Sequence, residues 1–234
     1  MAFRFKQFTV NDERSSMKVG TDAVLLGAWA GNLVPATILD IGTGCGLIAL
    51  MMAQRFQDAK ITAIDIHEGS VEQAGENFKV SRWTDNLSAE LISLQELASG
   101  RANTFDLIIS NPPFFSDSLL PPDPSKKIAR HTETLSFQEL AKGVNKLLKH
   151  GGHFALILPM ESHKAFSHHA TKKSFLKCRE LEIIPVKGKK PNRILSEWTK
   201  EQEEAVFESL CIRKTTLEYT DEYKKLTEEF YLAL

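Results

Sequence analysis

The chain has 234 residues, of which 42% are hydrophobic and 25% charged, and its formal net charge is −1. These values are those of an average soluble globular domain, so they exclude disordered and fibrous proteins. No stretch of the sequence approaches the roughly 20 apolar residues of a membrane span, and charged side chains interrupt the apolar residues at the N-terminus, unlike in a secretory signal. We therefore expect a cytoplasmic protein that is not associated with a membrane.

The N-terminal region predicts a small hairpin followed by a helix. Residues 3–10 alternate partly between apolar and polar side chains, and Asn11-Asp12 is a polar turn. An apolar segment then reaches Trp29, and Thr21 stands where an N-cap is expected.

From residue 37 onward, short apolar runs rich in β-branched residues alternate with segments of helical period, which is typical of an α/β fold with a parallel sheet. Helices are expected over residues 46–56 and 70–80, from Ser136, with Glu139 completing a capping box, to Gly151, and after Pro159. Strands are expected at 37–41, 60–65, 90–94, 105–110 and 153–158, and then near 181–186, 194–199 and 205–213.

The first of these strands runs into a glycine-rich turn that opens a helix, residues 42–46. Such a turn lets a ligand approach bare backbone at a helix N-terminus. The spacing excludes a dinucleotide fingerprint, because position 47 is Leu where the third glycine is required, and the Gly-Lys-Ser/Thr ending of a triphosphate loop is absent. The ligand of this loop need not carry a phosphate.

Two acids stand at the ends of the first two strands of the sheet. Asp65 lies 19 residues beyond Gly46, where a carboxylate can accept both ribose hydroxyls of a nucleoside. Asp40 can meet the ammonium of an amino-acid moiety. Together with the loop, these acids suit a cationic nucleoside such as S-adenosylmethionine; the alternative is that both acids cap neighbouring turns.

The strand at 105–110 leads directly into Asn111-Pro112-Pro113-Phe114. The prolines remove amide donors, so the backbone there presents carbonyl acceptors, and the Asn111 side chain adds another. An amino group that donates to Asn111 and to the Pro112 carbonyl has its lone pair directed at a methyl donor, and Phe114 offers a face for stacking. The tetrapeptide therefore predicts transfer of a methyl group to an amino nitrogen; the alternative is a rigid turn that ends a strand.

No metal site is predicted. The cysteines Cys45, Cys178 and Cys211 are far apart and lack the spacing of a zinc site or a disulfide framework. The proposed chemistry needs no separate base, so we expect surface positions rather than catalytic or ligand roles for His131, His163, His168 and His169.

The residues from Lys18 to about Pro159 resemble the class I, Rossmann-like, S-adenosylmethionine-dependent methyltransferase superfamily. The resemblance implies a seven-stranded, mostly parallel sheet with an antiparallel last hairpin and helices on both faces. The sequence departs from many nucleic-acid members after the third strand, where no acid stands, and Gln95 is the candidate for contact with the cofactor's adenine. The candidate cofactor-binding residues are Lys18, Gly20, Thr21, Asp22, Asp40, Gly42, Thr43, Gly44, Gly46, Asp65, Ile66 and Gln95.

Over nearly the full length, the chain is similar to the bacterial tRNA(Val) adenine-N6 methyltransferase family. The similar segments are residues 3–8, 18–22, 111–114, 130–131 and 223–231. The resemblance implies methylation of adenine 37, beside the anticodon, with residues 18–22 lining the methionine end of the cofactor site. The length of the chain and the lack of a repeat or linker predict one domain, 1–234: an N-terminal hairpin and helix (1–30), a cofactor and catalytic core (37–160), and C-terminal strands with a basic segment (161–234).

Other substrates stay open. Guanine-N2 ribosomal RNA methyltransferases typically have His where this chain has Phe115, and release-factor glutamine methyltransferases favour Tyr where it has Phe114. A noncatalytic RNA-binding subunit that retains the fold is a further alternative, which the intact Asp40, Gly42, Asp65 and Asn111 disfavour.

Contact with tRNA is expected from a basic segment and from a long loop. Residues 142–193 contain 12 Lys or Arg against 3 acids, whereas residues 194–234 contain 5 against 10. The basic segment is either an RNA footprint or a set of solvated helix faces. The long polar segment 115–135 follows the tetrapeptide, and long loops beside a site are commonly functional. We expect a monomer that contacts RNA through Phe115, Lys126, Lys127, Arg130, Lys187, Lys189, Lys190 and Arg193.

Overall fold

The computed structural model describes residues 2–112 and 135–233. The strands are β1 (Ala2–Arg4), β2 (Thr9–Asn11), β3 (Thr37–Ile41), β4 (Lys60–Asp65), β5 (Leu87–Leu91), β6 (Phe105–Ser110), β7 (Leu148–Pro159), β8 (Leu176–Val186), β9 (Arg193–Thr199) and β10 (Val206–Arg213). The helices are α1 (Thr21–Trp29), α2 (Leu47–Arg55), α3 (Glu68–Lys79), the 3-10 turn at Thr84–Asn86, α4 (Leu94–Gly100), α6 (Phe137–Leu147), α7 (Met160–Thr171) and α8 (Asp221–Thr227). None of the helices in these ranges is long and apolar enough to cross a membrane.

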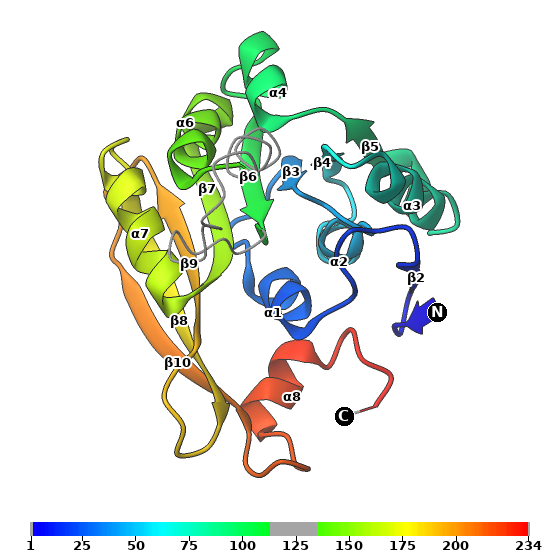
Figure 1. The fold of residues 1–234 in the computed structure, drawn as a ribbon, viewed down its shortest axis with the longest axis vertical. Helices are drawn as coiled ribbons and strands as arrows, with labels where there is room; N and C mark the ends of the chain where they lie inside the picture. Colours follow the sequence, from blue (N-terminus) through cyan, green and yellow to red (C-terminus); the bar gives the residue numbers. More distant parts are fainter. Residues whose placement is uncertain (1, 113–134, 234) are drawn as a thin grey trace, which may run out of the picture.

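One large, mostly parallel sheet organises the protein, with strand order β10-β8-β9-β7-β6-β3-β4-β5 (Figure 1). The Rossmann-like α/β architecture is confirmed, and so is the antiparallel last hairpin, because β9 runs antiparallel to both β7 and β8. The expected number of seven strands is wrong. An eighth strand, β10, pairs in parallel with the outer edge of β8, whose backbone groups would otherwise stay unpaired.

Helices cover both faces of the sheet, as expected (Figure 1). One hydrophobic core packs α1, α2 and α3 against the sheet, with Leu25 and Met51 fully buried. The other core packs α4, α6 and α7 against the opposite face, with Leu140 and Phe166 fully buried. Because both faces are covered, the central strands are continuous apolar runs, which is why their limits could be read from the sequence.

Four local expectations need correction. The strand expected at 90–94 is β5, three residues earlier, because Ser93 and Glu96 form a capping box that starts α4. The helix capped by Ser136 ends at Leu147 rather than at Gly151, because β7 begins directly at Leu148. Gly20, not Thr21, is the N-cap of α1, and it makes no side-chain cap.

The fourth correction concerns the N-terminal hairpin, which exists as β1 and β2 but turns at residues 5–8 rather than at Asn11-Asp12. The Phe5 amide donates to the Phe8 carbonyl at 2.9 Å, and the two rings stack at 4.8 Å. Phe5 also stacks on Tyr231, so the hairpin packs against the C-terminal segment.

The strand directions bring several loops to one side of the molecule. The parallel strands β3, β4, β6, β7, β8 and β10 all end at this side, and the antiparallel β9 begins there. We call this side the carboxyl edge. Open α/β sheets bind their ligands at such an edge, outside the ends of the strands.

Candidate active site

The glycine loop connects β3 to α2 at the carboxyl edge. The amides of Gly42 and Thr43 donate to the Ile64 carbonyl at 2.9 and 3.0 Å, which holds the loop against β4. Gly42 has a φ of +71°, and a Cβ built on it would meet no atom within 4 Å, so this backbone faces open space. Gly46 has a φ of +81°, and its Cβ would lie 2.5 Å from the Phe78 ring, so only glycine fits.

Asp40 lies fully buried beneath this loop. Its Oδ2 accepts a hydrogen bond from the Thr43 hydroxyl at 2.7 Å, whereas its Oδ1 has no partner among the described residues. Burial, together with the neighbouring charge of Asp65, raises the pKa of Asp40 to about 7. An unpartnered buried carboxylate oxygen is costly, and a cationic ligand group beside it would remove that cost.

Asp65, at the end of β4, is held in place by backbone amides. Gly44 donates to Oδ2 at 3.0 Å and His67 donates to Oδ1 at 2.9 Å. Each carboxylate oxygen keeps a further lone pair for a ligand hydroxyl. The next side chain, Ile66, is 59% exposed and offers an apolar surface beside the carboxylate.

Residues 12–17, which were not among the candidate residues, lie over the glycine loop. A Cβ on Gly44 would lie 3.1 Å from the Ser15 hydroxyl, which itself donates to the Met17 carbonyl at 2.7 Å. The ammonium of Lys18 donates to the carbonyls of Asp12 and Glu13. The Lys18 side chain therefore holds the backbone of residues 12–17 in place.

At the start of α1, the candidate residue Asp22 forms an ion pair with Arg193. The Arg193 Nε lies 2.9 Å from the Asp22 Oδ2. Arg193 is the first residue of β9, so the pair joins a candidate cofactor residue to a candidate RNA residue. Gly20 and Thr21 precede Asp22 and are exposed.

Asn111 follows the end of β6, beside the glycine loop. Ser110 is paired with Ile41 across the sheet, and its hydroxyl donates to the Ile41 carbonyl at 3.0 Å. The Asn111 side chain is only 7% exposed, and its Oδ1 has no hydrogen-bond partner in the described part of the chain. Pro112 is also buried. The structure therefore brings an unpartnered amide oxygen to the same edge as Asp40 and Asp65.

Several other candidates are exposed at the surface or lie outside the described residues. Gln95 is exposed, one residue into α4, and its side chain hydrogen-bonds Glu139 of α6. Lys187, Lys189 and Lys190 lie exposed in the turn after β8, with no ion pair to any described residue. The candidates Pro113, Phe114, Phe115, Lys126, Lys127 and Arg130 lie outside the described residues.

Surface positions were expected for the histidines of α7, but one of them, His163, is buried. His163 is 3% exposed, and its Nε2 lies 3.0 Å from the Ser196 hydroxyl. Burial and the nearby charge of Lys177 lower the pKa of His163 to about 4, so the ring is neutral at neutral pH. His168 is exposed and His169 half-buried.

Three buried side chains, His153, Cys178 and Glu197, place their possible ligand atoms within 4.8 Å of one another. Glu197 is already engaged, because Arg179 lies 3.2 Å from its Oε2 and the Gly31 amide donates to its Oε1. The group therefore has the composition of a metal site and the contacts of an ion-pair network.

The fold and these groups define a class of protein: a Rossmann-like domain with two carboxylates, Asp40 and Asp65, beside a glycine loop that lacks the triphosphate-loop sequence. A family model described as the methyltransferase small domain matches residues 17–183. The chain is 42% identical to the tRNA1(Val) (adenine(37)-N6)-methyltransferase of Bacteroides thetaiotaomicron, over 99% of this chain and 98% of that protein. It is 44% identical to the protein of the same name from Phocaeicola vulgatus, over the same shares. The chain belongs to the methyltransferase small domain family and, within it, to the family of these tRNA1(Val) (adenine(37)-N6)-methyltransferases.

A solved structure shows the same fold in a more distant protein. The predicted O-methyltransferase of Agrobacterium tumefaciens superposes with a TM-score of 0.71, over 92% of this chain and 99% of that one. At 18% identity, this similarity concerns the fold alone.

Proposed function

We propose that this protein transfers a methyl group from S-adenosylmethionine to the N6 amino group of an adenine in the anticodon loop of tRNA, which is adenine 37 of valine tRNA in the names of its relatives. The observation that carries the proposal is the buried Oδ1 of Asn111 at the end of β6, which has no hydrogen-bond partner among the described residues. A buried carbonyl oxygen without a donor costs free energy, and an amino group of the substrate supplies that donor.

The cofactor fits the groups at the carboxyl edge. The open backbone at Gly42 admits a ligand, the unpartnered Oδ1 of Asp40 can accept from its ammonium, and Asp65 with Ile66 can hold its ribose and adenine. When bound there, S-adenosylmethionine supplies a methyl group on a sulfonium, which is a strong electrophile. The assignment of these residues, and of Lys18, Gly20, Thr21 and Gln95, to the cofactor is part of the proposal.

The chemistry requires positioning more than proton transfer. Asn111 and the Pro112 carbonyl accept the two amino hydrogens, which directs the nitrogen lone pair away from the adenine ring. Transfer forms an N–C bond and breaks an S–C bond, which leaves a neutral thioether, and the surplus proton on nitrogen passes to water. A dedicated base is therefore not needed.

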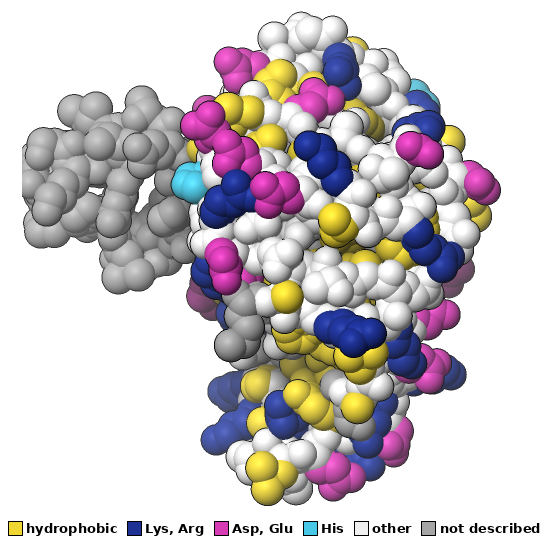
Figure 2. All heavy atoms as spheres, turned by 90° about the vertical axis from the view of Figure 1, so that its right-hand side faces the viewer, with side chains coloured by type: hydrophobic (Ala, Val, Ile, Leu, Met, Phe, Trp, Pro, Cys, Tyr) yellow, Lys and Arg dark blue, Asp and Glu magenta, His cyan; other side chains and the backbone are white. Residues whose placement is uncertain are grey.

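The tRNA is proposed to bind across the carboxyl edge. Lys187, Lys189 and Lys190 have no acid partner among the described residues, whereas other cations of the basic segment, such as Lys149 and Arg179, pair with acids of the fold. Figure 2 shows Lys and Arg side chains over the lower part of the molecule, where Figure 1 places α8 and the ends of β8 and β10. The unpaired cations are thus available for phosphates.

We further propose that the chain acts as a cytoplasmic monomer of one domain without a bound metal. The supporting observation for the last point is the engagement of Glu197 by Arg179 and Gly31, which leaves the His153 group without a free carboxylate.

Incubation with methyl-labelled S-adenosylmethionine and a valine tRNA transcript, followed by nucleoside analysis, tests the proposal. We expect N6-methyladenosine, and no label in a transcript with guanosine at position 37. Label in N2-methylguanosine of ribosomal RNA or in glutamine of a release factor would replace the proposed substrate. Tight tRNA binding without transfer to any substrate would identify a noncatalytic RNA-binding subunit.

A further inference from the structure

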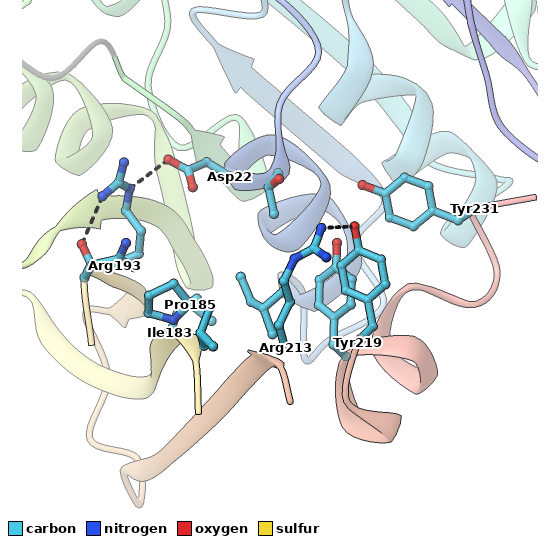
Figure 3. A pocket seen from close by; sticks show the side chains of 12 residues that line it. Asp22, Ile183, Pro185, Arg193, Arg213, Tyr219 and Tyr231 are labelled. Carbon is cyan, nitrogen blue, oxygen red and sulfur yellow. Dashed lines mark hydrogen bonds and ion pairs between the residues drawn. The ribbon is translucent and has the colours of Figure 1, made fainter. Parts of the chain in front are cut away.

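A pocket opens at the carboxyl edge, and the Asp22–Arg193 ion pair is part of its lining (Figure 3). Its volume is about 310 Å³, and its walls come from α1, from the ends of β8, β9 and β10, and from the C-terminal segment around α8. Pockets for small organic groups range from about 300 to 1,000 Å³, so this one has room for a single flat group.

A stack of planar side chains forms one wall of the pocket. The rings of Tyr219 and Tyr223 stack at 5.0 Å with an interplanar angle of 22°. The Arg213 guanidinium lies 4.0 Å from the centre of the Tyr219 ring and donates to its hydroxyl at 2.6 Å. Pro185 lies on the other side of the pocket (Figure 3). Unstacked RNA bases bind to such guanidinium and aromatic planes.

The charges around the pocket suit an RNA strand. Among the described residues that line the pocket, Asp22 is the one acid, and it is paired with Arg193. The Lys187 amide donates to the Arg213 carbonyl at 2.9 Å, so the basic turn of Lys187, Lys189 and Lys190 begins at the rim of the pocket. A base can enter the pocket while its phosphates lie near these cations.

The position of the pocket excludes the methylated adenine as its occupant. Asn111 follows β6, whereas the pocket lies at the ends of β9, β8 and β10, which are two, three and four strands away in the sheet. At about 4.8 Å between neighbouring strands, the two places are roughly 10 to 19 Å apart. A base bound to Arg213 therefore belongs to another nucleotide of the same loop.

We propose that this pocket binds the base of a second, unstacked nucleotide of the RNA loop, on the guanidinium plane of Arg213 that Tyr219 supports. The inference rests on the proposed RNA substrate and adds a specificity-determining site to it. The pocket holds one loop base while the adenine to be methylated lies at Asn111. Binding at both places selects RNA loops of suitable length and rejects isolated adenines.

The test uses the whole protein and an anticodon stem-loop RNA. Arg213→Ala removes the stacking plane, and Arg213→Lys keeps the charge but not the plane. Both variants should raise KM for the stem-loop about ten-fold or more, the effect of removing one base stack, with little change in kcat or cofactor affinity. Lys214→Ala, at an exposed neighbour outside the pocket, is the matched control and should behave as the wild type.

A double-mutant cycle identifies the bound base. In the wild type, removing the base at one loop position should raise KM as much as Arg213→Lys does. In the Arg213→Lys variant, removing the same base should raise KM no further. Tyr219→Phe keeps the ring and should therefore change KM only slightly from the wild-type value. The inference fails if Arg213→Lys matches the wild type, or if the losses add at every loop position. If the wild type methylates no RNA at all, the proposed function fails and this inference fails with it.

Discussion

The Thr43 hydroxyl donates to the Asp40 carboxylate at 2.7 Å, and this is one of few polar contacts that the fully buried acid makes. The hydrogen bonds from Thr43 and from the Ala49 backbone do not compensate for burial, so the pKa of Asp40 rises to about 7. The acid beneath the glycine loop is thus costly to ionise unless a cationic group of a ligand lies beside it.

This relationship predicts how stability depends on pH without cofactor. The pKa of Asp40 is raised above the value of about 3.9 in the unfolded chain, so the folded state binds the extra proton between these two values. Stability should fall as pH rises from about 4 to 7, by on the order of 4 kcal/mol from this group. Denaturant titrations at several pH values measure the slope. Asp40→Asn should flatten it, and an unchanged slope in that variant would contradict the assignment.

Cofactor binding should release a proton. A cationic ligand group beside Asp40 favours its ionised form and lowers its pKa. Calorimetry near pH 6.5 in two buffers of different ionisation enthalpy measures the proton count, which should fall toward zero in Asp40→Asn. Equal proton release in that variant would place the ligand's ammonium elsewhere.

Replacement of Asn111 should separate binding from transfer. Asn111→Ala removes an acceptor that the substrate amine needs in the transition state, and such a loss costs about 10²- to 10³-fold in kcat. Cofactor affinity, measured by calorimetry, should stay near that of the wild type. Asn145→Ala is the control, because its side chain bonds the Lys173 carbonyl on the opposite edge. Parallel loss of binding and turnover would show that Asn111 is structural.

The basic turn after β8 should set the salt dependence of tRNA binding. Joint replacement of Lys187, Lys189 and Lys190 by Ala should weaken binding and flatten the plot of log K against log salt, by about 0.7 to 0.9 for each phosphate that is no longer neutralised. The triple variant of Lys146, Lys172 and Lys173 removes equal charge from the opposite edge and should leave the slope unchanged. Equal slopes for both triple variants would remove the turn from the RNA surface.

The His153 group should respond to pH and not to chelators. Burial lowers the pKa of His153, but the carboxylates of Glu197 and Glu203 raise it more, so the net pKa is raised. The contribution of His153 to the free energy of unfolding is therefore full below about pH 6.5, and it is lost as pH rises through the raised pKa of this side chain. His153→Gln should remove this component from the pH profile of the melting temperature. A lower melting temperature in EDTA would reveal a structural metal.

The sequence alone determined the parts of the protein that depend on near neighbours in the chain. The strands β3, β4 and β6, the glycine loop and the Ser136 capping box were predictable, because burial on both faces and local hydrogen bonds leave a pattern within a few residues. The Asn111 tetrapeptide was visible for the same reason.

Only the tertiary structure decided which distant segments meet. The pairing of Asp22 with Arg193, the addition of β10 to the sheet and the stacking of Arg213 on Tyr219 beside α1 leave no periodic signal, because each depends on how separate elements pack. Burial of His163 against Ser196 belongs here too, since helical spacing alone does not say which face a mixed helix turns inward. The Asn111 tetrapeptide could thus be recognised from local residues, whereas the pocket beside Arg213 required the assembled edge of the sheet.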